Sequence, residues 1–391
     1  MHDETGVPKR TRTPRWGVRA AACLGAIGLV ATGLTFASAL PAGAKLSKHT
    51  ATTFSACEVT DTGGLGDKSF NWSAYQGLLD AQKAAGGSSK MSTHVIQTPP
   101  TGGTSTYASE IQTFINEDCG IIVTVGYLMD SATAAAANAN PNQKFAIVDD
   151  VPTTTSKEVD ALTYDTNQDA FLGGALSAAE STTGVVATYG GEKIPPVTIY
   201  MDGFVAGVRW YDQTYKKHVK VFGWTPLKDR DYSNGEYQGS GVFTGDFTNQ
   251  ANGEAATKTF FSDGADIVFP VAGSVGLGSV AAAKAAGAGH YVDWVDTDGC
   301  ISEPPDCKYF PMSITKGIVT SVEDAILSAF HGTFKGETYI GTLKNGGAVL
   351  VVDHKSALVE TAADKTMISQ ATAGIESGKL SVDPNHYPAV P

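Results

Sequence analysis

The pattern of apolar and polar positions predicts that strands and helices alternate along the chain from about residue 51 onward. The apolar runs are short and rich in β-branched and aromatic residues, which favour strands, whereas the Ala-rich stretches between them favour helices. In the first half, the predicted strands are TTFSACEVT (52–60), THVIQT (93–98), GIIVTV (120–125), KFAIVD (144–149) and DALTYD (160–165). The predicted helices there are 71–85, 104–117, 129–138 and 167–181, the last with Thr166 as a suitable N-capping residue.

The second half repeats this scheme and leads to a fold class. Its predicted strands are VTIYM (197–201), KVFGWT (220–225), IVFPVA (267–272), HYVDWVD (290–296), FPMSITK (310–316) and GGAVLVVD (346–353). Its predicted helices are 205–217, 251–263, 276–286, 318–330 and 365–380. Two successive sets of such units predict an α/β protein with two open, mainly parallel sheets joined by several crossings of the chain. Because ligands of open parallel sheets bind beyond the carboxyl ends of the strands, the residues directly after each strand are the candidates for a site.

The composition of the chain narrows the class of protein further. The chain has 391 residues, a hydrophobic content of 42% and a formal net charge of −12. This length suggests two domains, and the hydrophobic content excludes a mainly disordered chain. The acidic balance argues against a nucleic-acid partner, which requires clustered Lys and Arg. The sequence lacks a nucleophile elbow and a zinc-like Cys/His spacing, and the run 293–299 lacks the later Glu of a calcium loop. We therefore expect a protein that is not an enzyme and that uses no metal or cofactor.

The N-terminal segment 1–44 has the pattern of an export signal. Five basic residues between positions 9 and 19 precede an uncharged run, 20–41, and small residues follow at 37–39 and 42–44. Cleavage after Ala44 would remove five basic and two acidic residues and leave the remainder more acidic. The alternative is an uncleaved anchor, because about 20 uncharged residues are long enough to span a bilayer. Either interpretation places the folded part outside the cytoplasm.

The cysteines fit an extracytoplasmic compartment. Cys300 and Cys307 are seven residues apart in a loop-like stretch and form a plausible local disulfide. Cys57 and Cys119 lie at strand edges, where they either pair or stay as buried free thiols. A lipid anchor at Cys57 is not expected, because no apolar run leads directly into it.

The loop after the first strand carries the most suggestive chemistry. Its run from Asp61 to Asn71 is glycine-rich, but its spacing matches neither a P-loop nor a dinucleotide fingerprint. A carboxylate, an amide and the aromatic Phe70 suit a ligand that has hydroxyl groups and a flat ring. The alternative is an ordinary turn in which Asp67 or Ser69 caps a helix and the Phe belongs to the core.

The run DTGGLGDKSFNWSAYQGL (61–78) resembles the opening of the basic membrane protein (BMP) family. This family consists of exported ABC-transporter substrate-binding lipoproteins, and its characterised members include a purine nucleoside receptor. The resemblance implies a periplasmic-binding-protein-like type I fold, with two Rossmann-like lobes, several hinge crossovers and the ligand in the cleft between the lobes. The predicted first lobe is 52–166 plus about 299–330, and the second is 167–298 plus about 331–391. Further segments that agree in order are VGYLMD (125–130), KFAIVDD (144–150), LTYDTNQDAFLGGALSA (162–178), MDGFVAGV (201–208), AGSVGLG (272–278), VDTDG (295–299) and SITKG (313–317).

The resemblance implies four ligand-binding residues in the first lobe. Asp61 and Asn71 would hydrogen-bond the ligand, and Phe70 would form one face of an aromatic clamp on the base. Asp130 would face the edge of the base, although it is also well placed to cap the helix that follows it. Asp61 has an alternative as well, since it could form a structural ion pair with Lys316.

The second lobe would supply the other half of the site. Phe247 would form the opposite face of the clamp, although it could belong to the core, and Gly273 would offer backbone contacts. Asp298 (or Asp296) and Lys316 would engage the ribose. Only one of these two aspartates is expected to face the cleft.

These observations predict the extracytoplasmic solute-binding component of an ABC importer for purine nucleosides. Its expected partners are the nucleoside and the permease and ATPase subunits, and we expect a monomer without a nucleic-acid partner. The alternatives are another flat polar ligand such as riboflavin, or a ligand-sensing or surface protein on the same fold. The chain lacks the anchoring cysteine that the family carries directly after its apolar signal, and the loop 301–307 is longer than expected. The sequence therefore leaves tethering and selectivity open.

Overall fold

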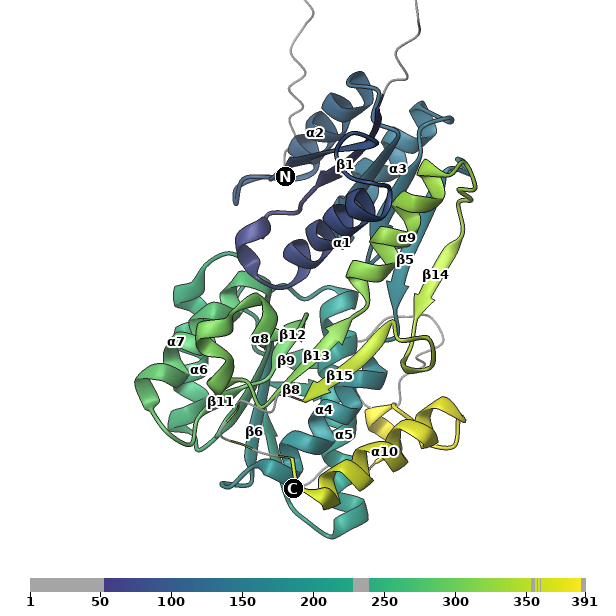
Figure 1. Ribbon diagram of the computed structural model, residues 1–391. Coiled ribbons are helices and arrows are strands. Elements are labelled where there is room, and N and C mark those ends of the chain that lie inside the picture. Colours follow the sequence, from purple (N-terminus) through teal and green to yellow (C-terminus); the bar gives the residue numbers. More distant parts are fainter. Residues whose placement is uncertain (1–52, 228–238, 353–355, 357, 359, 388–391) are drawn as a thin grey trace, which may run out of the picture. The chain divides into compact units, whose positions relative to one another are not determined.

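The computed structural model describes residues 53–227, 239–352, 356, 358 and 360–387. Within them, one parallel sheet has the strand order β14-β5-β4-β3-β1-β2. This sheet and the helices packed on it are called lobe 1 (Figure 1). Its strands are β1 (Phe54–Val59), β2 (Met91–Ile96), β3 (Ile121–Val125), β4 (Phe145–Val148), β5 (Val159–Tyr164) and β14 (Thr338–Gly341). All the strands predicted for the first half of the chain are therefore confirmed.

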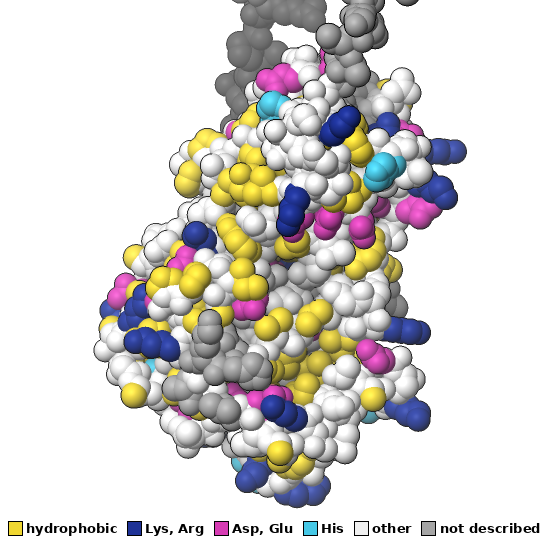
Figure 2. Space-filling model, viewed as in Figure 1, with side chains coloured by type: hydrophobic (Ala, Val, Ile, Leu, Met, Phe, Trp, Pro, Cys, Tyr) yellow, Lys and Arg dark blue, Asp and Glu magenta, His cyan; other side chains and the backbone are white. Residues whose placement is uncertain are grey.

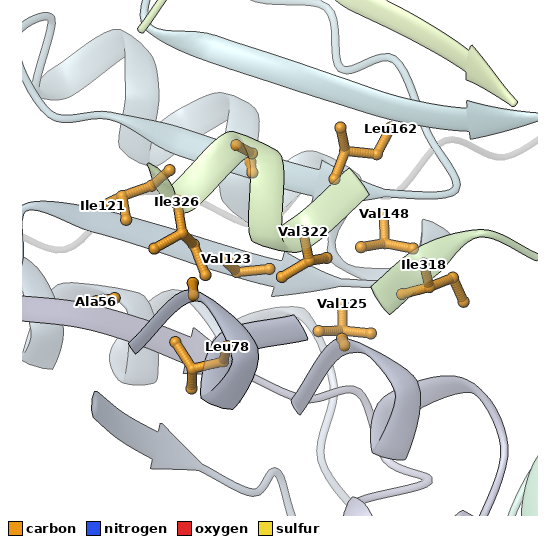
Figure 3. Close-up of a cluster of buried hydrophobic side chains, with 14 of the residues drawn as sticks. Ala56, Leu78, Ile121, Val123, Val125, Val148, Leu162, Ile318, Val322 and Ile326 are labelled. Carbon is orange, nitrogen blue, oxygen red and sulfur yellow. The ribbon is translucent and has the colours of Figure 1, made fainter. Parts of the chain in front are cut away.

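Helices cover both faces of the lobe 1 sheet because its central strands, such as β3 and β4, are apolar on both sides. Helices α1 (Phe70–Ala84) and α9 (Ile318–Phe330) pack on one face, and α2 (Thr104–Asn116) and α3 (Asp130–Ala139) on the other. Figure 3 shows side chains of α1 and α9 pointing toward alternate residues of β3. This alternation follows from the two-residue period of a strand. The labelled members of this core include Leu78, Val123, Val125, Val322 and Ile326, all with no exposed surface.

The second group of strands and its helices are called lobe 2. A parallel sheet has the order β11-β10-β6-β7, and a second sheet has the order β12-β13-β15, in which β15 is antiparallel. The strands are β6 (Val185–Gly190), β7 (Lys220–Phe222), β10 (Ile267–Val271), β11 (Tyr291–Val292), β12 (Trp294–Asp296), β13 (Met312–Lys316) and β15 (Ala348–Val352), with the separate antiparallel pair β8 (Trp224–Pro226) and β9 (Gly239–Gly241). The helices are α4 (Asn167–Glu180), α5 (Pro195–Tyr215), α6 (Gln250–Ser262), α7 (Gly276–Ala286), α8 (Gly299–Ser302) and α10 (Ala362–Glu376).

The prediction of a strand at 197–201 is wrong. These residues lie within α5, which begins at Pro195 and runs without a break to Tyr215. The side chains of Val197, Tyr200, Met201 and Phe204 are buried at helical spacing in the core of lobe 2. Burial of a helical stripe has overridden the strand preference of the local sequence, as tertiary packing commonly does.

Other differences from the predicted elements concern edges and interruptions. Strands β6, β9 and β14 were not predicted, and the predicted strand 220–225 is divided at Gly223, whose φ is +86°. The predicted strand 290–296 is divided at Asp293 into β11 and β12, which belong to different sheets. Helix α4 follows Thr166 as predicted, although the Thr166 side chain makes no capping hydrogen bond.

The described chain crosses between the lobes at three places. It passes from β5 to α4, from β13 to α9, and from β14 to β15. Two strands pair with the sheet of the other lobe than the predicted boundaries gave them. Strand β13 pairs with β12 and β15 and so belongs to lobe 2, whereas β14 pairs with β5 at the edge of the lobe 1 sheet. The prediction of multiple hinge crossovers is consistent with this topology.

Two disulfides lie within the described residues, one in each lobe. Cys300 is bonded to Cys307 in lobe 2, as their spacing indicates. Cys57 is bonded to Cys119 in lobe 1, which decides between the two alternatives for this pair. Of the helices that the structure describes, none combines the length and the apolar composition needed to cross a bilayer. The segment 1–44, predicted as an export signal or anchor, lies outside the described residues.

Candidate functional site

A cavity lies where strand ends of the two lobes meet. Lobe 1 contributes the loop after β1, the turn after β3 and the residue after β4. Lobe 2 contributes the start of α5, the loop before α6 and the ends of β10, β12 and β13. The position agrees with the rule that ligands bind beyond the carboxyl ends of parallel strands.

Asp61 and Asn71 hold one another in a fixed geometry on the lobe 1 side. Asp61 Oδ1 accepts hydrogen bonds from the Gly63 amide (2.8 Å) and from Asn71 Nδ2 (2.7 Å). The Asp61 amide in turn donates to Asn71 Oδ1 at 3.1 Å. The other carboxylate oxygen of Asp61, Oδ2, lies beside Gly126, where an added Cβ would stand 3.2 Å from it. A glycine at this position, with φ of +116°, therefore keeps Oδ2 accessible to the cavity.

Asp67 organises the start of α1. Its Oδ1 accepts from the amides of Ser69 (3.0 Å) and Trp72 (3.1 Å), and its Oδ2 accepts from the Asn71 amide at 2.7 Å. Asp67 is therefore the capping residue, and the Ser69 hydroxyl is left for another partner. That partner is in lobe 2, where Ser69 Oγ donates to Asp296 Oδ2 or the Val295 carbonyl, each at 3.0 Å.

Lys316 forms the charged centre of the cavity. Its Nζ lies 2.6 Å from Asp149 Oδ2 and 3.2 Å from Asp296 Oδ1. The same ammonium is 4.8 Å from the centroid of the Phe70 ring and 5.1 Å from that of Tyr200. Burial alone would lower the pKa of Lys316, but the carboxylates of Asp149 and Asp296 outweigh burial and raise it. The alternative of an ion pair between Asp61 and Lys316 is wrong, because the partners of Lys316 are Asp149 and Asp296.

Two aromatic side chains line the cavity from opposite lobes. Phe70 stands at the start of α1 and Phe247 lies in the loop before α6. Ser274 Oγ fixes this loop by donating to the Phe247 carbonyl at 2.6 Å, and Gly273 lies beside the Phe247 ring. Each ring is partly buried against the core of its own lobe, so Phe247 belongs both to the core and to the cavity wall.

Six of the eight predicted ligand-binding residues line this cavity, and two do not. Those that line it are Asp61, Phe70, Asn71, Phe247, Gly273 and Lys316. Asp298 was expected to engage the ligand, but it does not line the cavity. Its carboxylate accepts a hydrogen bond from the Cys300 amide at 2.8 Å and caps α8. Strand β12 ends at Asp296, which lines the cavity, whereas Asp298 is the N-capping residue of α8.

Asp130 is the second residue that the structure places elsewhere. It is the first residue of α3, and its carboxyl interacts with that of Asp150 outside the cavity lining. Burial raises the pKa of Asp150 to about 6, and the adjacent charge of Asp130 is a smaller cause of the same shift. The turn of residues Tyr127–Met129 separates Asp130 from the end of β3, which moves its side chain away from the strand end.

Comparison with known families identifies the chain. A family model described as Bmp, ABC transporter substrate-binding protein PnrA-like, matches residues 54–234 and 231–381. The chain belongs to this family. It is therefore a protein of the class that binds a small molecule outside the cytoplasm and works with the permease components of an ABC transporter. The Bmp family is a family of solute-binding proteins and not a class of enzymes.

Individual relatives agree with this assignment. The ABC transporter nucleoside-binding protein BmpA of Lactococcus lactis is 27% identical over 344 residues, which cover 85% of this chain and 89% of that protein. A CD4+ T-cell-stimulating antigen of Listeria monocytogenes is 27% identical over 314 residues, covering 77% and 81% of the two chains. Basic membrane protein A1 of Borrelia garinii is 26% identical over 240 residues, covering 60% and 62%.

Solved structures confirm the fold class of this Bmp-family chain. An ABC transporter solute-binding protein from Aeropyrum pernix superimposes with a TM-score of 0.69 at 22% identity, covering 84% of this chain and 92% of that one. A second solute-binding protein, from Conexibacter woesei, gives a TM-score of 0.60 at 16% identity, with coverages of 86% and 100%. At these identities the likeness shows the fold alone.

Sequence reasoning missed Asp149, which lies directly against Lys316. Asp149 is the residue after β4, and it was counted as the end of the predicted strand 144–149. If the predicted strand had ended at Val148, Asp149 would have been the residue after it. The rule that ligands bind beyond the carboxyl ends of strands would then have selected Asp149. Burial raises the pKa of Asp149 to about 6, although the nearby Lys316 opposes this shift.

The ligand-free protein is expected to lose stability through Asp61 as the pH rises. Burial raises the pKa of Asp61 from 3.8 to about 7, so the folded state binds this proton more tightly than the unfolded state. The contribution of Asp61 to the free energy of unfolding is therefore largest below its unfolded pKa and falls as the pH rises from 3.8 to about 7. Urea unfolding midpoints at low and neutral pH should show a smaller decrease for Asp61→Asn than for the wild type. Asp118→Asn, at an exposed position, is the control, and an equal decrease in all three proteins would contradict the prediction.

Proposed function

We propose that this Bmp-family protein binds purine nucleosides in the cavity between its lobes as the solute-binding component of an ABC importer. One observation carries the proposal. Two aromatic rings from opposite lobes line the same cavity as the Lys316–Asp296 pair and Asp61. The name of the relative from L. lactis, a nucleoside-binding protein, supports the same ligand class.

The chemistry of the cavity suits the two parts of a nucleoside. A base held between Phe70 and Phe247 would gain about 1–3 kcal/mol for each stacked face. Ribose hydroxyls would donate to the carboxylates of Asp61 and Asp296 and accept from the Lys316 ammonium. Hydrogen bonds to charged groups contribute roughly 1.5–3 kcal/mol each, so several of them suffice for micromolar binding after the cost of association.

The contacts between the lobes suggest how binding is coupled to transport. Besides the Ser69 contact with Asp296, the Trp294 indole Nε1 donates to the Lys68 carbonyl at 3.1 Å. Both contacts join the loop before α1 to β12, whose last residue, Asp296, lines the cavity. A nucleoside that binds the closed form more tightly than the open form would shift the population toward closure, and the permease would then receive the closed, loaded protein.

The surface supports a small-molecule ligand more than a nucleic acid. On the face shown in Figure 2, Lys and Arg side chains stand singly or in small groups and form no continuous stripe. This arrangement does not suit the regular phosphate spacing of a nucleic acid backbone.

Titration calorimetry is the direct test of the proposed ligand. Guanosine, adenosine and inosine are expected to bind with micromolar or tighter affinity, and cytidine and free bases more weakly. Tighter binding of riboflavin than of any nucleoside would instead favour a flavin carrier. If no nucleoside binds, the proposal is wrong. Mass spectrometry of small molecules released from protein purified without denaturant gives an independent identification.

The aromatic clamp makes a separate prediction. Phe70→Leu and Phe247→Leu are each expected to weaken purine nucleoside binding about tenfold, because leucine retains apolar volume but loses the stacked face. Phe243→Leu is the matched control, since Phe243 packs against Trp224 in lobe 2 and does not line the cavity. Calorimetry that finds all three variants equally affected would assign the loss to core packing and not to stacking.

A further inference from the structure

The contact between Asp149 and Lys316 joins the two lobes in the wall of the cavity. Lys316 is the last residue of β13 in lobe 2 and directly precedes Gly317, where the chain crosses to α9. Asp149 is the residue after β4 in lobe 1. The side chains of both are nearly buried, with 4% and 7% exposed, and their charged atoms lie 2.6 Å apart.

The backbone of Asp149 is held in an uncommon conformation. Its φ is +70°, in the left-handed region that residues other than glycine rarely adopt, although Asp and Asn tolerate it best. The Asp149 amide donates to the Leu162 carbonyl of β5 at 2.8 Å, which fixes this conformation. Such conformations persist where the surrounding structure imposes them and are concentrated at functional sites.

The Lys316 ammonium depends on Asp149 for its position. Its contact with Asp296 is longer, at 3.2 Å, and the second Asp296 oxygen accepts from Ser69. A lysine side chain is a flexible four-carbon stem, so a single longer contact orders it less than two contacts from opposite sides do. With Asp149 in place, the ammonium lies 4.8 Å from the Phe70 ring centroid, on the side of the cavity where the proposed clamp would hold a nucleoside.

We propose that Asp149 is a positioning residue of the ligand site, which holds the Lys316 ammonium across the lobe boundary so that it faces the bound nucleoside. The inference rests on the proposed function for its ligand. Asp149 of lobe 1 would thus act on the ligand through the side chain of Lys316 of lobe 2. The affinity of the closed site then depends on the charge of Asp149 as well as on the groups that touch the ligand.

Acid is therefore expected to weaken ligand binding partly through this residue. The titratable groups that face Asp149 are Lys316 and Asp296 in lobe 2, with Asp150, Tyr164 and Tyr200 also close enough to interact electrostatically. Burial raises the pKa of Asp149 to about 6, so its carboxylate is lost over a mildly acidic range in which a lysine keeps its charge. Lys316 then keeps only Asp296 as a close partner.

The test compares Asp149→Asn with Asp150→Asn. Asparagine tolerates the left-handed backbone, so Asp149→Asn removes the charge with little added strain, and Asp150→Asn makes the same change one residue away, outside the cavity lining. Calorimetry with guanosine at neutral pH is expected to give at least a tenfold loss of affinity for Asp149→Asn and less than a twofold change for Asp150→Asn. Between neutral pH and about pH 5, the wild type should lose more affinity than Asp149→Asn does.

A measurement without ligand separates this inference from the proposed function. In protein with ¹⁵N-labelled lysine, the Lys316 ammonium signal can be assigned by its loss in Lys316→Met. We expect Asp149→Asn to shift or broaden this signal and Asp150→Asn to leave it unchanged. If Asp149→Asn changes neither the ammonium signal nor guanosine affinity, the inference is overturned. If the wild type binds no nucleoside but the signal changes only in Asp149→Asn, the positioning of Lys316 stands and the proposed ligand is wrong.

Discussion

Replacing Lys316 by methionine is expected to abolish measurable nucleoside binding and to destabilise the folded protein by about 3 kcal/mol or more. Among the described residues, Lys316 is the one cation that lines the cavity, and it is in contact with two nearly buried carboxylates. Methionine fills a similar volume but leaves Asp149 and Asp296 without a counter-charge. The loss of stability comes from this uncompensated burial and not from a cavity.

The stability loss of Lys316→Met should depend on pH in a defined direction. Without the ammonium, the folded-state pKa of Asp149 would rise above its present value of about 6. Protonation then relieves the repulsion, so the destabilisation relative to the wild type is smaller at acidic pH and grows as the pH rises through neutrality. Urea unfolding of both proteins at mildly acidic and mildly alkaline pH measures the difference.

Lys284→Met provides a matched control for Lys316→Met. Lys284 also lies 2.6 Å from a carboxylate oxygen, that of Asp306, but 46% of its side chain is exposed. Exposed ion pairs of this kind contribute about 0–1 kcal/mol, because water and salt screen them. Equal destabilisation by the two substitutions would show that burial of the Lys316 pair does not matter, and unchanged nucleoside affinity in Lys316→Met would remove it from the site.

Replacing Gly207 by alanine is expected to destabilise lobe 2 by about 3 kcal/mol or to prevent folding. Gly207 lies on α5, where an added Cβ would overlap the carbonyl oxygen of Phe171 on α4 and stand 2.8 Å from the Ala175 amide nitrogen. Gly174 on α4 makes the reciprocal approach, since its Cβ would overlap the carbonyl oxygen of Phe204 on α5. Backbone atoms of a packed helix cannot move aside as the end of a flexible side chain can, so the helices must separate.

The effect of Gly207→Ala is best measured by urea unfolding against Gly103→Ala. A Cβ at Gly103 would meet no atom within 4 Å, and its backbone is extended, so we expect a change below about 1 kcal/mol there. Helix α5 also supplies Val197 to the cavity and Tyr200 to the Lys316 ring contacts. Separation of α4 and α5 is therefore expected to weaken ligand binding as well, whereas a stable, fully binding Gly207→Ala protein would contradict the close packing.

The central strands of lobe 1 could be predicted from sequence because they are buried on both faces. Strands such as β3 and β4 are covered by helices on either side, so they appear as uninterrupted apolar runs between turn residues. The family resemblance likewise found six of the residues that line the cavity, because its motifs follow strands in both lobes. The sequence alone was less informative where an element is short or lies at an edge, as β14 does, since few buried residues then mark it.

The remaining features depend on contacts between segments that are distant in the sequence. The stretch 197–201 has strand-forming residues, but its burial in the core of lobe 2 along α5 makes it helical. The choice between Asp296 and Asp298 depends on where β12 ends, and this is set by its pairing with β13. The sequence by itself determined the α/β class, the family and six of the residues that line the cavity. Only the tertiary structure decided that Lys316 pairs with Asp149, because 167 residues separate them and the pairing exists only where the two lobes meet.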